Sequence, residues 1–222
     1  MNRPAMGGPV KIVILGAGGT GQDVVDLLGD LDPHGLTYEC VGFLDDAEDK
    51  QGTTVAGLPV LGPLKTAAET SDVLFVNALG SPTTYRQIPG VLDRLDLPAE
   101  RYATLIHPSA VVSRRASLGA GCVIYPHVTI AAAARLGRCV TVLSHAAINH
   151  HAVLGDHVIV ASHASISGAV HIGANCYIGA ACSIREGVSV GAGAMVGMGS
   201  VVLHDVRESS VVVGNPADRL TP

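Results

Sequence analysis

Aromatic side chains and positive charge are both scarce in this sequence. Aromatic residues make up 3% of the 222 residues, tryptophan is absent, and the formal net charge is −5. A surface that binds nucleic acid needs basic side chains and rings that stack on bases, so we expect no nucleic-acid partner. The sequence also lacks a run of 18 apolar residues, and it therefore predicts no membrane span.

Sequence motifs for metal binding, disulfides and secretion are also missing. The five cysteines are an odd number and form no CxxC pair, which argues against a disulfide framework or a zinc site. The apolar run that ends at Gly16 is too short for the hydrophobic region of a signal peptide. We therefore expect a cytoplasmic protein with reduced thiols and no bound metal.

An aliphatic residue recurs at every sixth position through the second half of the chain. The sixteen positions all carry Val, Leu or Ile: Val112, Leu118, Ile124, Ile130, Leu136, Val142, Ile148, Leu154, Val160, Ile166, Ile172, Ile178, Ile184, Val190, Val196 and Val202. Two residues before each stands a small or β-branched residue, and Cys122, Cys176 and Cys182 occupy such places. A period of six fits neither a helix nor a plain strand, and it predicts a solenoid of short strands joined by turns.

A second period of eighteen residues lies on top of the first. Glycine recurs at positions 119, 137, 155, 173 and 191, so three hexapeptides make one coil. We expect about five coils, with these glycines adopting the tight turn geometry at one corner. The residues after 202, which include Val211–Ala217, are expected to cap the open end of the last coil.

The first part of the chain alternates short apolar runs with helix-like segments. Buried strands are expected at 11–15, 40–44 and 72–80, and helices at 22–28 and 83–95. This pattern predicts a Rossmann-like α/β domain over residues 1–105, followed by the solenoid over residues 106–222.

A glycine-rich loop follows the first predicted strand. It contains Gly16, Gly18, Gly19, Thr20 and Gly21, and its amides are suited to hold a phosphate or another anion. The Gly-x-Gly-x-x-Gly spacing also matches the dinucleotide fingerprint, but the domain is short for a full dinucleotide fold. A single nucleotide-bearing ligand fits better than NAD, and a mere turn is the remaining alternative.

Together, the hexapeptides, the closing Val-Gly-Asn-Pro-Ala and the Gly-loop domain resemble a known family. They are similar to the left-handed β-helix sugar O/N-acyltransferases, typified by sialic acid O-acetyltransferases and UDP-4-amino-sugar N-acetyltransferases. This resemblance implies a homotrimer, acetyl-CoA between subunits, and a UDP-type nucleotide sugar on the first domain. It assigns substrate binding to the Gly loop and to Asp45 and Asp46, and we add Gly80 at the end of the third predicted strand.

The resemblance also places the general base at His150. Imidazole is the side chain whose titration lies near neutral pH. The family has an acid after this histidine, whereas this chain has His151, which we treat as a second candidate catalytic residue.

The predicted acetyl-CoA contacts lie farther along the repeat. Ile159 stands where many members of the resembling family have a histidine near acetyl-CoA. Gly168 matches the Ser/Ala-Gly turn of that family, and the resemblance implies that its amide can face the thioester. Gly179, Ala180 and Gly197 are expected to line the pantetheine groove.

We therefore predict an acetyltransferase that acts on an amine or hydroxyl of a nucleotide-linked sugar. The alternatives are O-acetylation of a free sugar or sialic acid, a non-acylating β-helix binding protein, a zinc enzyme of the γ-carbonic anhydrase type, and an NAD-dependent enzyme.

Overall fold

The chain folds into two compact units. The computed structural model describes residues 8–31 and 38–220. The first unit comprises the described residues up to 79 together with 90–104, and the second comprises 80–89 together with the residues from 105 onward. The segment 80–89 therefore belongs to the same unit as the hexapeptide repeat, and the last change of unit falls between Thr104 and Leu105.

The first unit is built on a five-stranded sheet. Its strands are β1 (Val10–Leu15), β2 (Tyr38–Leu44), β3 (Thr54–Val55), β4 (Leu58–Gly62) and β5 (Leu74–Asn77), in the order β3-β4-β2-β1-β5. All neighbouring strands are parallel except β3 and β4. The residues Ile12 to Leu15 are fully buried, as expected for a strand covered on both faces. This sheet confirms the predicted α/β domain.

The described residues of this part of the chain form two α-helices. Helix α1 (Gly19–Leu31) begins inside the glycine-rich loop and buries Val24, Leu27 and Leu28. The helix predicted over 83–95 is shorter, because a 3₁₀ turn at Tyr85–Gln87 precedes α2 (Ile88–Arg94). Pro89 stands in the first turn of α2, where its missing N–H costs no intrahelical bond. Within the described ranges, neither helix is both long and apolar enough to cross a membrane.

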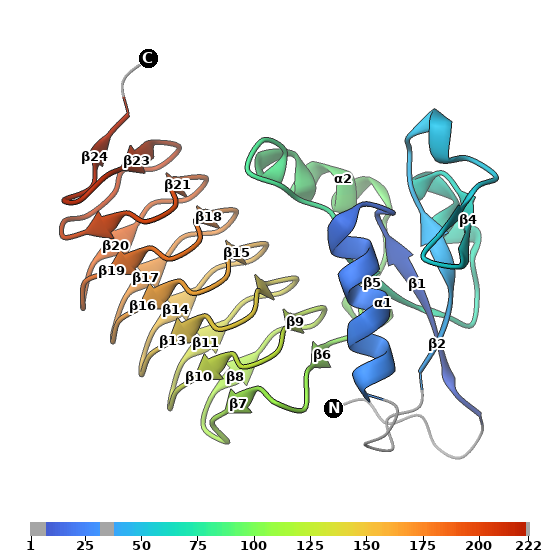
Figure 1. Ribbon diagram of the computed structural model, residues 1–222, viewed down its shortest axis with the longest axis horizontal. Coiled ribbons are helices and arrows are strands. Elements are labelled where there is room, and N and C mark those ends of the chain that lie inside the picture. Colours follow the sequence, from blue (N-terminus) through green and yellow to red (C-terminus); the bar gives the residue numbers. More distant parts are fainter. Residues whose placement is uncertain (1–7, 32–37, 221–222) are drawn as a thin grey trace. The chain divides into compact units, whose positions relative to one another are not determined.

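The second unit is a parallel β-helix with three faces (Figure 1). The first face contains β7 (Val111–Val112), β10 (Thr129–Ile130), β13 (Ala147–Ile148), β16 (Ser165–Ile166), β19 (Ser183–Ile184) and β22 (Val201–Val202). The second contains β8 (Ser117–Leu118), β11 (Arg135–Leu136), β14 (Val153–Leu154), β17 (His171–Ile172) and β20 (Ser189–Val190). The third contains β6 (Leu105–Ile106), β9 (Val123–Ile124), β12 (Thr141–Val142), β15 (Ile159–Val160), β18 (Tyr177–Ile178), β21 (Met195–Val196), β23 (Val211–Val213) and β24 (Asp218–Arg219).

The strand pairing follows the eighteen-residue period of the sequence. Thr129 pairs with Ala147 and Ile130 pairs with Ile148. The same offset joins the other coils as far as β22, whereas β23 pairs with β21 at an offset of sixteen, Met195 with Val211. The second residue of each hexapeptide strand points into the core, so Ile130, Ile148 and Ile166 form a buried ladder. Strand β24 runs antiparallel to β23 and ends the third face. The predicted solenoid is confirmed.

The recurring glycines have a different cause from the one we predicted. A positive φ occurs every six residues from Gly121 to Gly199, two positions after the series that contains Gly155. The structure gives Gly155 no positive φ; instead, a Cβ added there would come within 2.5 Å of the backbone nitrogen of Ala174 in the next coil. These glycines therefore allow the coils to stack closely, whereas residues such as His151 adopt the left-handed turn conformation.

Candidate active site

The turn between β13 and β14 presents two adjacent imidazoles. This turn is fixed to the coils on both sides: the amide of His151 donates to the carbonyl of Ala132 at 3.1 Å, and the carbonyl of His150 accepts from Ala169 at 2.9 Å. The side chain of Asn149 donates to the carbonyl of Ile166 at 2.9 Å. Both histidines are exposed. The repeat thus holds two solvent-facing rings on a rigid backbone.

Gly168 lies directly beneath the ring of His150. It occupies the equivalent turn position one coil later, and an added Cβ there would lie 2.9 Å from Nε2 and 3.0 Å from Nδ1 of His150. Any other residue would displace the imidazole, because ordinary contacts between such atoms are about 3.5–4.0 Å. The structure therefore brings together three of the predicted residues: His150, His151 and Gly168. We call the corner that carries them the histidine edge.

The two imidazoles are joined by a hydrogen bond. Nδ1 of His150 lies 3.2 Å from Nδ1 of His151, and the rings are nearly perpendicular at 79°. One Nδ1 donates and the other accepts, depending on the tautomers. His151 therefore lies in hydrogen-bond contact with His150 where the family pattern has an acidic residue.

The predicted pantetheine residues lie on another corner of the same unit. Gly179 and Ala180 follow β18, and Gly197 follows β21, so all three lie where the third face turns into the first. We call this corner the glycine edge. A Cβ on Gly179 would come within 2.6 Å of the backbone nitrogen of Met198. Within one chain, the first face of the β-helix separates these residues from His150.

Ile159 is buried against a segment that sequence reasoning did not connect to the β-helix. Only 8% of Ile159 is exposed, and a Cβ added to Gly80 would lie 2.6 Å from its Cδ1 atom. The segment 80–89 is held by Tyr85, whose hydroxyl donates to the carbonyl of Gly193 at 3.0 Å. The guanidinium of Arg86 donates to the same carbonyl at 3.0 Å. Gly80 is thus placed by contacts inside the second unit.

The glycine-rich loop of the first unit connects β1 to α1. Gly16 has a φ of +102°, and a Cβ on Gly21 would collide with its carbonyl oxygen. A Cβ added to Gly18 or Gly19 would have no other atom within 4 Å. Gly19, Thr20 and Gly21 form the first turn of α1, where backbone N–H groups favour an anion.

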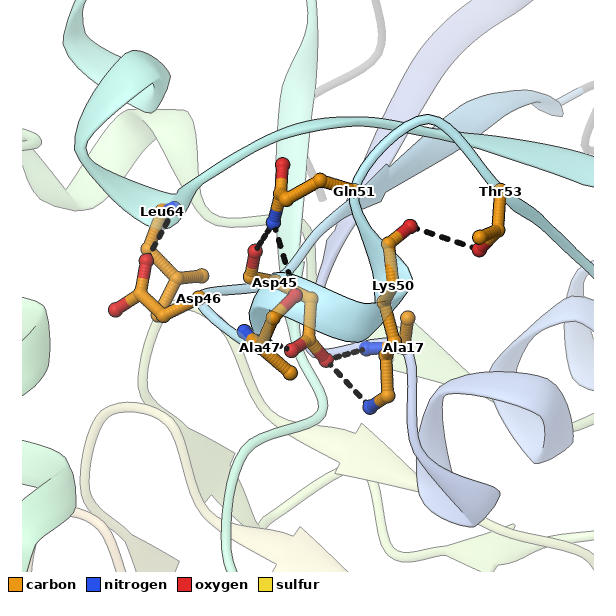
Figure 2. Close-up of polar contacts among 8 residues, drawn as sticks. All are labelled: Ala17, Asp45, Asp46, Ala47, Lys50, Gln51, Thr53 and Leu64. Atoms are coloured by element: carbon orange, nitrogen blue, oxygen red, sulfur yellow. Dashed lines mark hydrogen bonds and ion pairs between the residues drawn. The ribbon is translucent and has the colours of Figure 1, made fainter.

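Asp45 is bonded to the chain's own donors. Its Oδ2 accepts from the amide of Ala17 at 2.7 Å and from Nζ of Lys50 at 2.9 Å, while Oδ1 accepts from the amide of Ala47 at 2.9 Å (Figure 2). Partial burial alone would raise its pKa, but these hydrogen bonds and the charge of Lys50 lower the pKa below its ordinary value.

Asp46 also has an internal partner. Its Oδ1 accepts from the amide of Leu64 at 2.8 Å, where a 3₁₀ turn begins (Figure 2). The sequence pattern identified both carboxylates, but Lys50 and Ala17, which meet at Asp45, were missed. A carboxylate after a parallel strand with a lysine five residues later is a weak pattern that does not by itself predict this contact.

A column of three further histidines lies along the glycine edge. The rings of His127 and His145 stack at 4.9 Å, and those of His145 and His163 at 4.8 Å. Among the described residues, no group of three or more His, Cys, Asp or Glu is arranged to hold a metal ion.

Two family models match the chain, one on each part of it. The model of the PglD N-terminal domain matches residues 11–89, and the model of the GMPPB C-terminal domain matches residues 101–196. The first match covers the Gly loop and Asp45, and the second covers the histidine edge as far as Gly168.

Solved structures of similar fold cover nearly the whole chain. The acetyltransferase domain of PglB from Neisseria gonorrhoeae, in complex with acetyl coenzyme A, is 32% identical over 96% of this chain and 100% of its own, with a TM-score of 0.83. PerB from Caulobacter crescentus, in complex with CoA and GDP-perosamine, is 27% identical over 98% of this chain and 99% of its own, with a TM-score of 0.80.

A curated relative matches a shorter stretch. UDP-N-acetylbacillosamine N-acetyltransferase from Bacillus subtilis is 34% identical over 119 residues, which are 51% of this chain. The match spans only half, 50%, of that relative's own length.

Proposed function

This chain belongs to the hexapeptide-repeat sugar acyltransferase family, and we propose that it transfers acetyl from acetyl-CoA to an amine of a nucleotide-linked sugar. The observation that carries this proposal is the imidazole of His150, held over Gly168 and bonded to His151 on an exposed turn. The fold match to an acetyltransferase domain with acetyl coenzyme A, and to PerB with GDP-perosamine, supports the choice of donor and acceptor.

The proposed reaction is a direct attack with His150 as general base. The sugar amine attacks the thioester carbonyl, a C–N bond forms, and the C–S bond breaks. Nε2 of His150 takes the proton that the amine loses, and this proton then passes to the departing sulfur of CoA. The products are an amide and free CoA, and no covalent enzyme intermediate is needed. The amide of Gly168 is our candidate donor for the developing oxyanion.

His151 fixes the tautomer that this step requires. We assign the Nδ1 proton to His150 and the acceptor lone pair to Nδ1 of His151, across the 3.2 Å separation. Nε2 of His150 then carries the lone pair that receives the proton. A neutral acceptor orients the ring, but it stabilises the imidazolium less than the carboxylate of the family pattern would.

Acetyl-CoA binding is assigned to the glycine edge, which lies on a different corner from His150. A second copy of the chain that placed its glycine edge against the histidine edge would complete the site, and a closed homotrimer repeats this contact three times. Gly179, Ala180 and Gly197 then line the pantetheine channel with small side chains. Ile159, buried beneath Gly80, offers acetyl-CoA no hydrogen-bond donor in the place of the family's histidine.

The nucleotide part of the sugar is assigned to the first unit. The Gly loop with Gly16, Gly18 and Gly21 offers backbone N–H groups at the start of α1. The curated relative favours a UDP-linked acceptor, and PerB favours a GDP-linked one. Both substrates and reduced thiols are typical of the cytoplasm, where we place the reaction.

The test is CoA release by purified His150→Ala with acetyl-CoA and a UDP-4-amino-sugar or GDP-perosamine. We expect a loss of at least about 100-fold in kcat, since general-base catalysis contributes 10²–10⁴. His171→Ala, on the second face of the β-helix and outside both edges, is the control and should retain activity. A wild-type rate in His150→Ala would refute the assignment of the base. Acetylation of a hydroxyl instead of the amine would correct the acceptor.

Subunit mixing tests the shared site. His150→Ala lacks the base, and Ala180→Trp blocks the channel, so each should be inactive alone. After the two are unfolded and refolded together, interfaces that pair an intact histidine edge with an intact glycine edge should restore activity. No restored activity in mixed oligomers, or a monomer in sedimentation experiments, would overturn the shared site.

A further inference from the structure

The contacts of Asp45 change the role that the family resemblance gave this residue. Three N–H donors converge on its two oxygen atoms, from Ala17, Ala47 and Lys50. Only 14% of its side chain is exposed. A carboxylate that already accepts from three donors has little capacity left for a ligand, so its placement beside the loop calls for another explanation.

The segment after β2 is folded to bring Lys50 to this carboxylate. The amide of Lys50 donates to the carbonyl of Ala47 at 3.1 Å, and its own carbonyl accepts from the hydroxyl of Thr53 at 2.7 Å. The side chain of Gln51 donates to the carbonyl of Asp45 (Figure 2). The main chain around Lys50 is therefore fixed before any ligand arrives.

Stability alone does not account for this pair. The side chain of Lys50 is 32% exposed, and ion pairs that solvent reaches add little to folding stability. Lys50 is also the only cation in the sequence from Asp45 to Thr53, which carries Asp46, Glu48 and Asp49 as well. A single ammonium is thus held beside a backbone loop that favours anions, in surroundings that would otherwise repel them.

We propose that Asp45 is a positioning residue and Lys50 a diphosphate-binding residue of the nucleotide-sugar site. Asp45 fixes the loop through the amide of Ala17 and holds the ammonium of Lys50 next to it. Lys50 cancels the charge of Asp45 and offers its remaining N–H donors to a phosphate oxygen. The ligand class is a nucleoside diphosphate, so this inference rests on the function proposed above.

Binding of UDP and GDP to the full chain, measured by calorimetry, tests the role of Lys50. We expect Lys50→Met to weaken binding about 10-fold, and to leave the binding of uridine and guanosine unchanged because they carry no phosphate. Lys65→Met removes the same charge from an exposed position and should bind UDP and GDP as the wild type does. Wild-type affinity in Lys50→Met would overturn the role of Lys50, and so would an equal loss for the nucleosides.

Substitution of Asp45 separates positioning from simple charge. Asp45→Asn removes a negative charge beside the anion, so electrostatics alone predicts tighter binding. The amide has one acceptor oxygen and one NH2 group, however, so at least one of the three donors loses its partner. The proposal therefore predicts at least 10-fold weaker binding of UDP and GDP. Unchanged or tighter binding would overturn it.

Steady-state kinetics add a measurement that a merely structural role would not move. In Lys50→Met and Asp45→Asn, KM for the nucleotide sugar should rise at least 10-fold, while kcat and KM for acetyl-CoA stay constant. Lys50→Arg keeps the charge and should restore most of the affinity. Equal effects on both substrates would refute the assignment. If UDP and GDP bind with this Lys50 dependence but no acetyl transfer occurs, the proposed function fails and the binding role survives.

Discussion

Replacing Gly168 with alanine tests the geometry of the histidine edge most directly. The new Cβ would lie 2.9 Å from Nε2 and 3.0 Å from Nδ1 of His150, and it would meet Cε1 of the same ring. Ordinary contacts are about 3.5–4.0 Å, so the ring must move by about 1 Å. The backbone has no comparable difficulty, because the structure gives Gly168 no positive φ.

This displacement should lower the rate much more than the stability. A shift of about 1 Å in a catalytic group costs about 100-fold in rate, which corresponds to about 2.7 kcal/mol. The exposed ring of His150 can turn toward solvent, and alanine restricts the unfolded chain slightly more than glycine does. The free energy of unfolding should therefore stay within about 1 kcal/mol of the wild-type value.

The assay combines kcat for CoA release with urea denaturation of the same sample. Gly168→Ala should also be combined with His150→Ala, because two residues that act through one step are not additive. When His150 is already alanine, adding Gly168→Ala should lower kcat by less than about 2-fold. A wild-type kcat in the single variant would refute the reasoning, and so would a full 100-fold loss added on top of His150→Ala.

Three further expectations concern other residues. Aspartate and asparagine both tolerate the positive φ at position 151. The acid limb of the pH profile of kcat/KM should lie about one pH unit higher in His151→Asp than in His151→Asn. Superimposed acid limbs in the two variants would contradict a role of this position in orienting the base. Gly155→Ala should destabilise the β-helix by about 1–3 kcal/mol in urea because its Cβ meets the next coil, whereas Gly29→Ala, with open space in α1, should stabilise by about 0.5–1 kcal/mol. Burial raises the pKa of Cys139 from 9.0 to about 12, so the thiol contributes stability that is present below pH 9 and is lost as the pH rises toward 12. Cys139→Ala should therefore lose less thermal stability than the wild type between these pH values. An unchanged dependence of the unfolding temperature on pH would refute this role of the thiol.

The six-residue period of aliphatic residues was enough to predict most of the fold. Each aliphatic residue of the series points inward because a coil of three hexapeptides returns it to the same face, as Ile130 and Ile148 do. The cause of the glycine series was not accessible in the same way. A close approach between coils and a positive φ both select glycine, and only the coordinates place Gly155 against the backbone of Ala174.

The candidate site was predictable where it follows the repeat. The period places His150 and Gly168 at equivalent turns of successive coils, so their contact is inherent in the eighteen-residue spacing. Contacts that depend on irregular loops were not predictable. The bond between Asp45 and Ala17 joins residues 28 positions apart, and it depends on how β2 leaves the sheet.

Both candidate sites depend on a glycine without a side chain, Gly168 at the histidine edge and Gly21 in the Gly loop. Replacing these two glycines should nevertheless have different effects. Gly168 leaves room for an imidazole that can move, and Gly21 leaves room for the carbonyl of Gly16, which cannot. Alanine at Gly168 should therefore change the rate and spare the fold, because the strain is relieved by a side chain at the surface. Alanine at Gly21 should disturb the loop itself and weaken nucleotide binding together with stability, because backbone must shift to relieve it. The two substitutions thus test separately the proposed base, which a side chain supplies, and the proposed binding loop, which the backbone supplies.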